Sequence, residues 1–276
     1  MFGKKNKRME RKIYTSGYSP ENDRDKLLSF SVKEAYKSIR TNIVLSLIKD
    51  GCKIITFSSP IPSEGKSTTI SNIAVSLSKA FYKVLIIDCD LLKPRLHRTF
   101  KIKNNSGLSN VLSRLSTFEE SVQVLDNYSG LHVLTSGIAV PNPSEMLGSE
   151  RMKNMLEVLS SKYDYILIDT PPVNVLSDGL HLARISDGVV LVVRQGFSTQ
   201  DDVKQALNSF KFISAKILGI VYNGASIEST GKGYGAKSMK YNSYSYAAMY
   251  GDKDRCEKNT GGTEFIEIEN ENASPK

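Results

Sequence analysis

The chain has 276 residues, of which 40% are hydrophobic, and this is enough for a packed core in one large domain or two small ones. No apolar run reaches the roughly 18 residues that a bilayer span needs, and the three cysteines are too few and too scattered for a disulfide framework or a zinc site. The composition therefore argues against a membrane-spanning or disulfide-stabilised protein and predicts a cytoplasmic one.

The net charge of +8 is concentrated at the N-terminus. Residues 1–12 carry six Lys or Arg and one Glu, so +5 lies there and +3 is left for the other 264 residues. A basic arm of this kind can contact anionic lipid or nucleic acid, but a solvated tail is the commoner outcome. We expect residues 1–30 to form a flexible basic arm, and we expect no nucleic-acid partner.

The first periodic segment, residues 31–47, predicts an amphipathic helix. Its apolar residues recur at spacings of three and four and would form a buried stripe of Val32, Ala35, Ile39, Ile43 and Leu47. The other side carries Glu34, Lys37 and Arg40, also spaced by three. This charged set is either ordinary pairing along a solvated helix face or a contact between subunits.

Residues 54–74, IITFSSPIPSEGKSTTISNIA, have the layout of a phosphate-binding P-loop. A short apolar strand is followed by a loop of Ser, Pro and Gly, which leads into a segment with helical spacing. In this layout backbone N–H groups face the phosphates, Lys66 reaches the outer phosphates and the Ser67 hydroxyl ligates Mg²⁺. The residues that we expect to bind the nucleotide are Ser63, Glu64, Gly65, Lys66, Ser67 and Thr68.

The loop departs from the strict pattern G-x-x-x-x-G-K-[ST]. Pro60 stands at the first Gly position, and Ser63 stands where a second small, flexible residue is common. A bare GKS can also arise by chance in a surface loop. The strand before it and the helix after it favour the P-loop interpretation.

Two later strands are predicted to end in carboxylates. Residues 82–90 form an apolar run that finishes in Asp88 and Asp90, and residues 163–172 form one that finishes in Asp169 before two prolines. Ligands of open parallel sheets bind beyond the carboxyl ends of the strands, so these carboxylates would lie beside the P-loop. Asp169 fits the Walker B pattern, in which the carboxylate holds Mg²⁺ directly or through water.

The remaining segments alternate between helix and strand patterns up to residue 225. We expect helix and loop over 101–130 with a helix start at 107–112, strands at 131–137, 189–193 and 217–222, a turn at 141–145, and helices at 149–161 and 199–212. In the helix at 149–161 a stripe of Met and Leu is assigned to the core. This alternation predicts one α/β domain over residues 31–225, with a mostly parallel sheet.

The chain changes character in residues 226–276, which we expect to form a flexible tail. A 17-residue window should hold about one of the 13 tyrosines, yet residues 234–250 hold five of them: Tyr234, Tyr241, Tyr244, Tyr246 and Tyr250. Such a segment is either a low-complexity adhesive tail or a set of phosphate acceptors, because a flexible phenol can enter an active site.

Taken together, the motifs resemble those of the bacterial tyrosine kinases of capsular and exopolysaccharide synthesis, in the form that is a separate cytoplasmic protein. The resemblance spans roughly residues 30–250 and rests on the P-loop, VLIIDCDLLKP, YDYILIDTPPV, EAYKSIRTNI, PNPSEML, SDGVVLVVRQG and the tyrosine cluster. It implies a P-loop NTPase-like fold with helices on both faces of the sheet, ATP and Mg²⁺ as cofactors, and transfer of phosphate to protein tyrosine.

The resemblance also implies the roles of single residues. Lys66 would bind the phosphates, Asp90 and Asp169 would hold or position the metal together with Ser67, and Asp88 would accept the proton of the incoming tyrosine. Asn223, after the last strand, would face the adenine. Transfer needs in-line positioning, charge neutralisation and a proton acceptor, and this set can supply all three.

Family members join into rings through an E-x-x-R-x-x-R contact, which Glu34, Lys37 and Arg40 match with Lys in place of the first Arg. In a ring the tail of one subunit would be phosphorylated by its neighbour, and the added negative charge would loosen the ring. Because Lys lacks the planar fork of Arg, the contact would be weaker here. Leu92 also departs from the family pattern, in which a basic residue usually follows D-x-D-L. The family further implies a separate membrane-embedded activator of polysaccharide export, a cognate tyrosine phosphatase, and recruitment to the inner face of the membrane.

Two other interpretations stay open. A partition- or septum-positioning switch ATPase shares the superfold, but its signature Lys would fall at position 60, where this chain has Pro60, and it usually lacks a tyrosine cluster. A non-catalytic regulator could use a degraded P-loop to sense nucleotide. The intact set of Lys66, Ser67 and the three carboxylates argues against that second alternative.

Overall fold

The computed structural model describes residues 20–225, with side chains from residue 30 onward. These residues form a seven-stranded sheet in the order β3-β4-β2-β5-β1-β6-β7. The strands are β1 Lys53–Ser58, β2 Val84–Asp88, β3 Gln123–Val124, β4 Leu131–Leu134, β5 Tyr165–Asp169, β6 Gly188–Arg194 and β7 Ile217–Asn223. All neighbouring pairs are parallel except β3 with β4, so the prediction of a mostly parallel sheet is confirmed.

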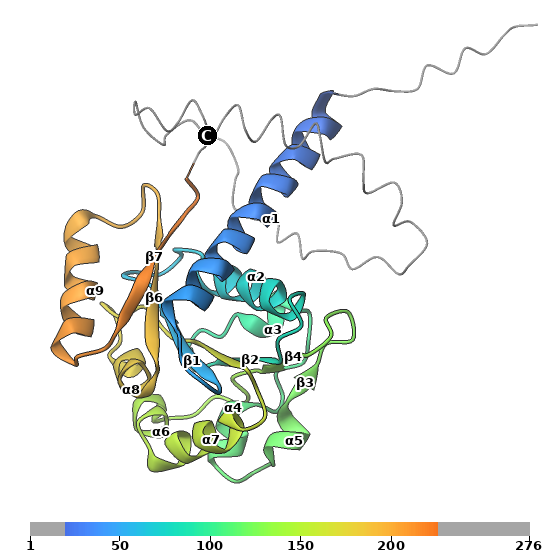
Figure 1. Cartoon of the computed structure of the whole chain (residues 1–276). Coiled ribbons are helices and arrows are strands. Elements are labelled where there is room, and N and C mark those ends of the chain that lie inside the picture. The colour runs from blue at the N-terminus through green and yellow to red at the C-terminus, as the bar shows by residue number, and fades with distance from the viewer. Residues whose placement is uncertain (1–19, 226–276) are drawn as a thin grey trace, which may run out of the picture.

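Helices cover both faces of the sheet, as Figure 1 shows. They are α1 Pro20–Ser46, α2 Lys66–Ser78, α3 Leu96–Thr99, α4 Leu108–Leu112, α5 Phe118–Ser121, α6 Pro143–Leu147, α7 Glu150–Ser160, α8 Asp178–Ile185 and α9 Gln200–Phe212. The architecture is the three-layered α/β arrangement that the alternating sequence pattern predicts.

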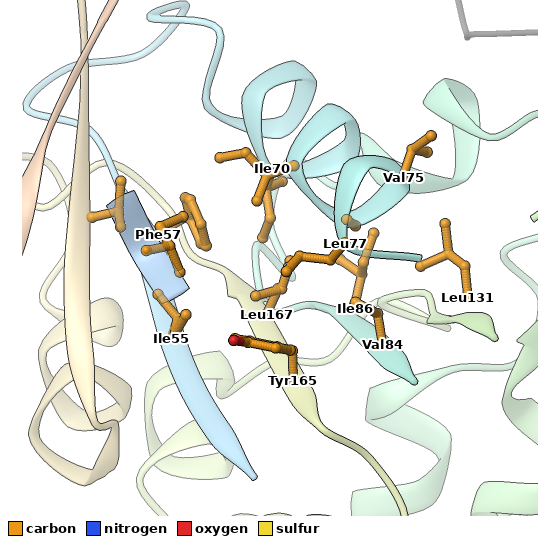
Figure 2. Packing of buried hydrophobic residues seen from close by; sticks show 14 of the residues in the cluster. Ile55, Phe57, Ile70, Val75, Leu77, Val84, Ile86, Leu131, Tyr165 and Leu167 are labelled. Atoms are coloured by element: carbon orange, nitrogen blue, oxygen red, sulfur yellow. The ribbon is translucent and has the colours of Figure 1, made fainter. Parts of the chain in front are cut away.

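The central strands β1, β2, β5 and β6 are largely buried on both faces, because successive side chains of a strand point to opposite sides and helices cover both sides. In β2, Val84 and Ile86 pack in the cluster under α1, α2 and α3, whereas Leu85 and Ile87 pack in the cluster under α4, α6, α7 and α8. Figure 2 shows the first cluster, with side chains of α2 lying over those of β1, β2, β4 and β5. A third cluster packs α8 and α9 against β6. The Met/Leu stripe of α7 lies in the core, as predicted.

The first helix differs from its prediction in two ways. It begins at Pro20 and not at residue 31, in keeping with a sequence that places Pro at the first helical position and acidic residues directly after it. Ile43 and Leu47 of the expected stripe are buried, but Val32 and Ala35 are exposed. The reason is visible in Figure 1, where the first half of α1 extends past α2 and the sheet.

Other differences are local. The expected turn at 141–145 contains the start of α6, whose first residue is Pro143, a position where the fixed φ of proline suits a helix. The sequence pattern did not indicate α3, α8 or the short antiparallel edge strand β3, whereas α5 lies within residues 101–130, where helix and loop are expected. Among the residues that the structure describes, no helix is both long enough and apolar enough to cross a membrane.

Candidate active site

The carboxyl ends of three central strands lie side by side and hold the predicted acidic residues. Asp169 at the end of β5 is in register with Phe57 of β1 on one side and with Asp88 of β2 on the other. The P-loop leaves β1 directly beyond this edge and enters α2 at Lys66. The structure thus brings the P-loop and both strand-end carboxylates together, as the sequence predicts.

Lys66, Ser67 and Asp169 form one hydrogen-bonded group. The Lys66 ammonium donates to one oxygen of Asp169, and the Ser67 hydroxyl donates to the other at 2.7 Å. Asp169 is fully buried and Lys66 is 6% exposed. Burial raises the pKa of the Asp169 carboxyl, and the Lys66 charge and the two hydrogen bonds oppose that rise.

Asp88 is also fully buried, and its carboxylate accepts from three backbone N–H groups: those of Asp90 at 3.2 Å, Arg95 at 3.2 Å and Leu96 at 3.1 Å. Burial first, and the neighbouring Asp169 carboxylate second, raise the pKa of Asp88 to about 7. Asp90 is only half-buried and accepts from the backbone N–H of Lys93 at 2.9 Å. Asp90 is therefore the more accessible of the two carboxylates that follow β2.

The P-loop backbone is held in an unusual conformation. Ser63 and Gly65 have φ of 67° and 82°, in the left-handed region that favours glycine. The side-chain amide of Asn223, at the end of β7, donates to the carbonyl of Glu64 at 2.9 Å. An ideal Cβ on Gly65 would lie 2.1 Å from Nδ2 of this amide. Asn223 thus packs against the P-loop, and its predicted role toward adenine stays a prediction.

Replacing Gly65 by Ala should therefore damage the site by two routes, backbone strain and a clash with Asn223. We expect the affinity for Mg-ADP to fall at least about tenfold and the stability to fall by about 1–3 kcal/mol. Titration calorimetry and thermal unfolding would measure the two. Gly51→Ala is the matched control, because Gly51 has φ of 72° with nothing within 4 Å of an added Cβ. Equal nucleotide affinity in the two variants would contradict this account.

The charged set on α1 makes contacts within its own chain. Lys37 pairs with Glu34 at 2.6 Å on an exposed face, and the Arg40 guanidinium donates to the carbonyl of Ser76 in α2 at 2.9 Å. The Lys37–Glu34 pair matches the solvated-face interpretation, whereas the half-buried Arg40 packs against α2, and the subunit contact stays a prediction. Leu92 is exposed in the loop after β2. The five tail tyrosines lie outside the described residues.

Sequence reasoning missed the loop between β6 and α9 as part of this site. The buried carboxylate of Glu64 accepts from the backbone N–H of Arg194 and from the hydroxyl of Ser198. The available signal was the motif SDGVVLVVRQG, because β6 ends at the same sheet edge as β1.

The donor set suits a nucleotide-bound Mg²⁺. Among the described residues there is no cluster of three or more His, Cys, Asp or Glu that could hold a metal ion alone. Mg²⁺ is usually bound by one or two carboxylates together with substrate phosphates, and not by an all-protein cage. The Ser67 hydroxyl and the Asp169 carboxylate, which lie 2.7 Å apart, meet that requirement, and Asp90 follows the neighbouring strand β2.

Comparison with known proteins decides the family. Residues 52–220 match the family described as "AAA domain". The chain is 37% identical over 221 residues to the tyrosine-protein kinase YwqD of Bacillus subtilis (strain 168), covering 80% of this chain and 87% of YwqD. The chain belongs to the bacterial tyrosine-kinase family.

Solved structures agree with this membership. The chimerical protein CapA2B2 has 37% identity and a TM-score of 0.65, over 68% of this chain and 82% of that one. The septum site-determining protein MinD of Pyrococcus horikoshii has 24% identity and a TM-score of 0.54, over 63% and 72% of the two chains. The likeness to MinD shows a shared P-loop fold and no more, so the tyrosine-kinase relatives are the ones that bear on activity.

Proposed function

We propose that this protein is an ATP- and Mg²⁺-dependent protein-tyrosine kinase that phosphorylates its own C-terminal tyrosines in trans. The observation that supports it most directly is the group of Lys66, Ser67 and Asp169 at the P-loop, with Asp88 on the adjoining strand. The relatives named as tyrosine kinases supply the class of acceptor. Regulation of capsular or exopolysaccharide synthesis is the process that the family membership suggests.

The chain supplies positioning, charge and a proton acceptor. Lys66 exchanges its contact with Asp169 for the outer phosphates, and the N–H groups of residues 63–68 bind the phosphate oxygens. Ser67, Asp169 and Asp90 would hold Mg²⁺, which would supply positive charge against the phosphates. Asp88 accepts the tyrosine proton, and a pKa of about 7 suits a base that works near neutral pH.

We further propose a ring-like homo-oligomer whose contact includes Glu34, Lys37 and Arg40. Lys37 and Glu34 are exposed, and the half of α1 before them extends past the sheet, so this helix is accessible to a neighbour. A ring of this kind would bring the tail of one subunit to the P-loop of the next. Phosphorylation of the tail would add charge and weaken the contact.

The partners follow from the same proposal. A membrane-embedded activator of polysaccharide export would recruit the chain to the inner face of the membrane, and a tyrosine phosphatase would reverse the modification.

Trans phosphorylation is tested by mixing two variants of the full chain, neither of which can phosphorylate its own tail. One variant carries Lys66→Met with an intact tail, and the other carries an intact site with Phe at Tyr234, Tyr241, Tyr244, Tyr246 and Tyr250. With Mg-ATP, and with or without a cytoplasmic activator peptide, neither should form tail phosphotyrosine alone. The mixture should place it on the Lys66→Met chain, as mass mapping of residues 234–250 would show.

Two outcomes would change the interpretation. Labelling of wild-type chains with none in the mixture would indicate transfer within one chain. ATP turnover with no phosphotyrosine under any condition would favour the switch ATPase, and ATP binding with neither turnover nor transfer would favour the nucleotide-sensing regulator.

A further inference from the structure

A buried carboxylate inside a phosphate-binding loop needs an explanation. Glu64 is 1% exposed and precedes Gly65 and Lys66, in a loop whose predicted ligand is anionic. A carboxylate close to phosphates would repel them. The side chain of Glu64 therefore has to serve something other than direct contact with nucleotide.

The hydrogen bonds of Glu64 show where its side chain is used. One carboxylate oxygen accepts from the backbone N–H of Arg194, and the other accepts from the hydroxyl of Ser198. Both donors flank or belong to the loop between β6 and α9, residues 195–199. Because one oxygen has a donor from the end of β6 and the other a donor from this loop, the carboxylate binds protein groups in place of phosphate or metal.

Further contacts join the same segments. The Asn223 amide donates to the Glu64 carbonyl at 2.9 Å, and the backbone N–H of Gln195 donates to the Asn223 carbonyl at 2.9 Å. The Arg194 guanidinium donates to the Ser63 carbonyl at 3.4 Å. Three segments that are far apart in the sequence thus meet at residues 63–65, where Ser63 and Gly65 both have a positive φ. A non-glycine residue such as Ser63 keeps a positive φ only when its surroundings impose it.

We propose that Glu64 is a positioning residue whose carboxylate ties the P-loop to loop 195–199 and so fixes the backbone of residues 63–65 for phosphate binding. The proposal rests on the proposed function in so far as the P-loop binds nucleotide. It adds the Ser198 hydroxyl, and no other side chain of that loop, as a second determinant of nucleotide affinity. Residue 64 must accept two buried hydrogen bonds, one from a backbone N–H and one from a hydroxyl.

Three variants of the full chain test this, with Mg-ADP as the probe in titration calorimetry. Glu64→Ala leaves the Arg194 N–H without its acceptor, and we expect at least about a tenfold loss of affinity. Glu64→Gln should stay close to wild type, because its carbonyl accepts from Arg194 and its amide donates to Ser198. Ser198→Ala should weaken binding about threefold alone and not at all in the Glu64→Ala background.

The matched control is Thr199→Ala. Thr199 lies next to Ser198 and caps α9: its hydroxyl accepts from the N–H of Asp202 at 3.2 Å and donates to the Asp202 carboxylate at 2.7 Å, so its side chain bonds within the first turn of α9. Its loss should lower the melting temperature and leave the Mg-ADP affinity unchanged. If Glu64→Ala likewise lost stability but kept its affinity at a temperature where it is folded, Glu64 would be merely structural and the proposal would fail.

Hydrogen exchange of P-loop amides without nucleotide gives a second measurement. Exchange in residues 61–66 should be faster in Glu64→Ala than in wild type, and unchanged in Thr199→Ala. Equal exchange and equal affinity in Glu64→Ala and wild type would overturn the positioning role and leave the kinase proposal intact. Faster exchange and weaker Mg-ADP binding, in a protein that never forms phosphotyrosine, would support this inference and contradict the kinase.

Discussion

Lys66→Met should abolish tail phosphorylation and also destabilise the protein without nucleotide. Lys66 carries the charge that we assign to the outer phosphates, so we expect the transfer rate to fall by at least about 10²-fold. Its ammonium is also the cation paired with Asp169, which is fully buried. Breaking a buried pair by removing one partner costs about 3–5 kcal/mol, because the other charge is left uncompensated.

The two effects can be separated with one further variant. Lys66→Met alone should lower the melting temperature by roughly 10 °C. The double variant Lys66→Met with Asp169→Asn removes both charges, so its melting temperature should return much of the way to that of the wild type. It should not recover transfer. Recovery of phosphotyrosine in the double variant would show that inactivity came from instability, and a wild-type rate in Lys66→Met would remove Lys66 from the mechanism.

The parts of the site that the sequence predicts are those set by local patterns. A continuous apolar run that ends in Asp marks a buried parallel strand, and parallel strands place their carboxyl ends at one edge. The neighbouring positions of Asp88 and Asp169 follow from that rule once β2 and β5 pair. Lys66 and Ser67 are fixed by their position at the start of the helix after the loop.

The parts that the sequence does not predict depend on contacts between distant segments. Glu64 and Arg194 are 130 positions apart, and Asn223 is 159 positions from Glu64, so no local spacing signals either contact. The exposure of Val32 and Ala35 likewise depends on how far the sheet extends under α1, which helical periodicity cannot tell. The eight residues of α8 are too few to show a clear period before β6.

Asp88→Asn should separate the proton acceptor from the metal site. If Asp88 takes the tyrosine proton, its loss should lower the transfer rate by about 10²–10⁴-fold and leave Mg-ATP affinity nearly unchanged. Asp90→Asn is the matched comparison, since Asp90 follows the same strand and is more accessible. There the expected effect is a higher Mg²⁺ requirement, because Asp90 is assigned to the metal. Single-turnover transfer at several Mg²⁺ concentrations measures both.

The burial of Asp88 makes this comparison decisive. Its carboxylate is fully buried and accepts from three backbone N–H groups within residues 90–96, so a phenol can contact it only after a local movement. The neighbouring Asp169 carboxylate and burial keep its pKa high, which favours proton uptake once contact is made. If the rate loss appeared in Asp90→Asn and not in Asp88→Asn, the accessible carboxylate would be the base. Asp88 would then be the residue that fixes residues 90–96, and its three N–H donors would be the reason for its acidic side chain.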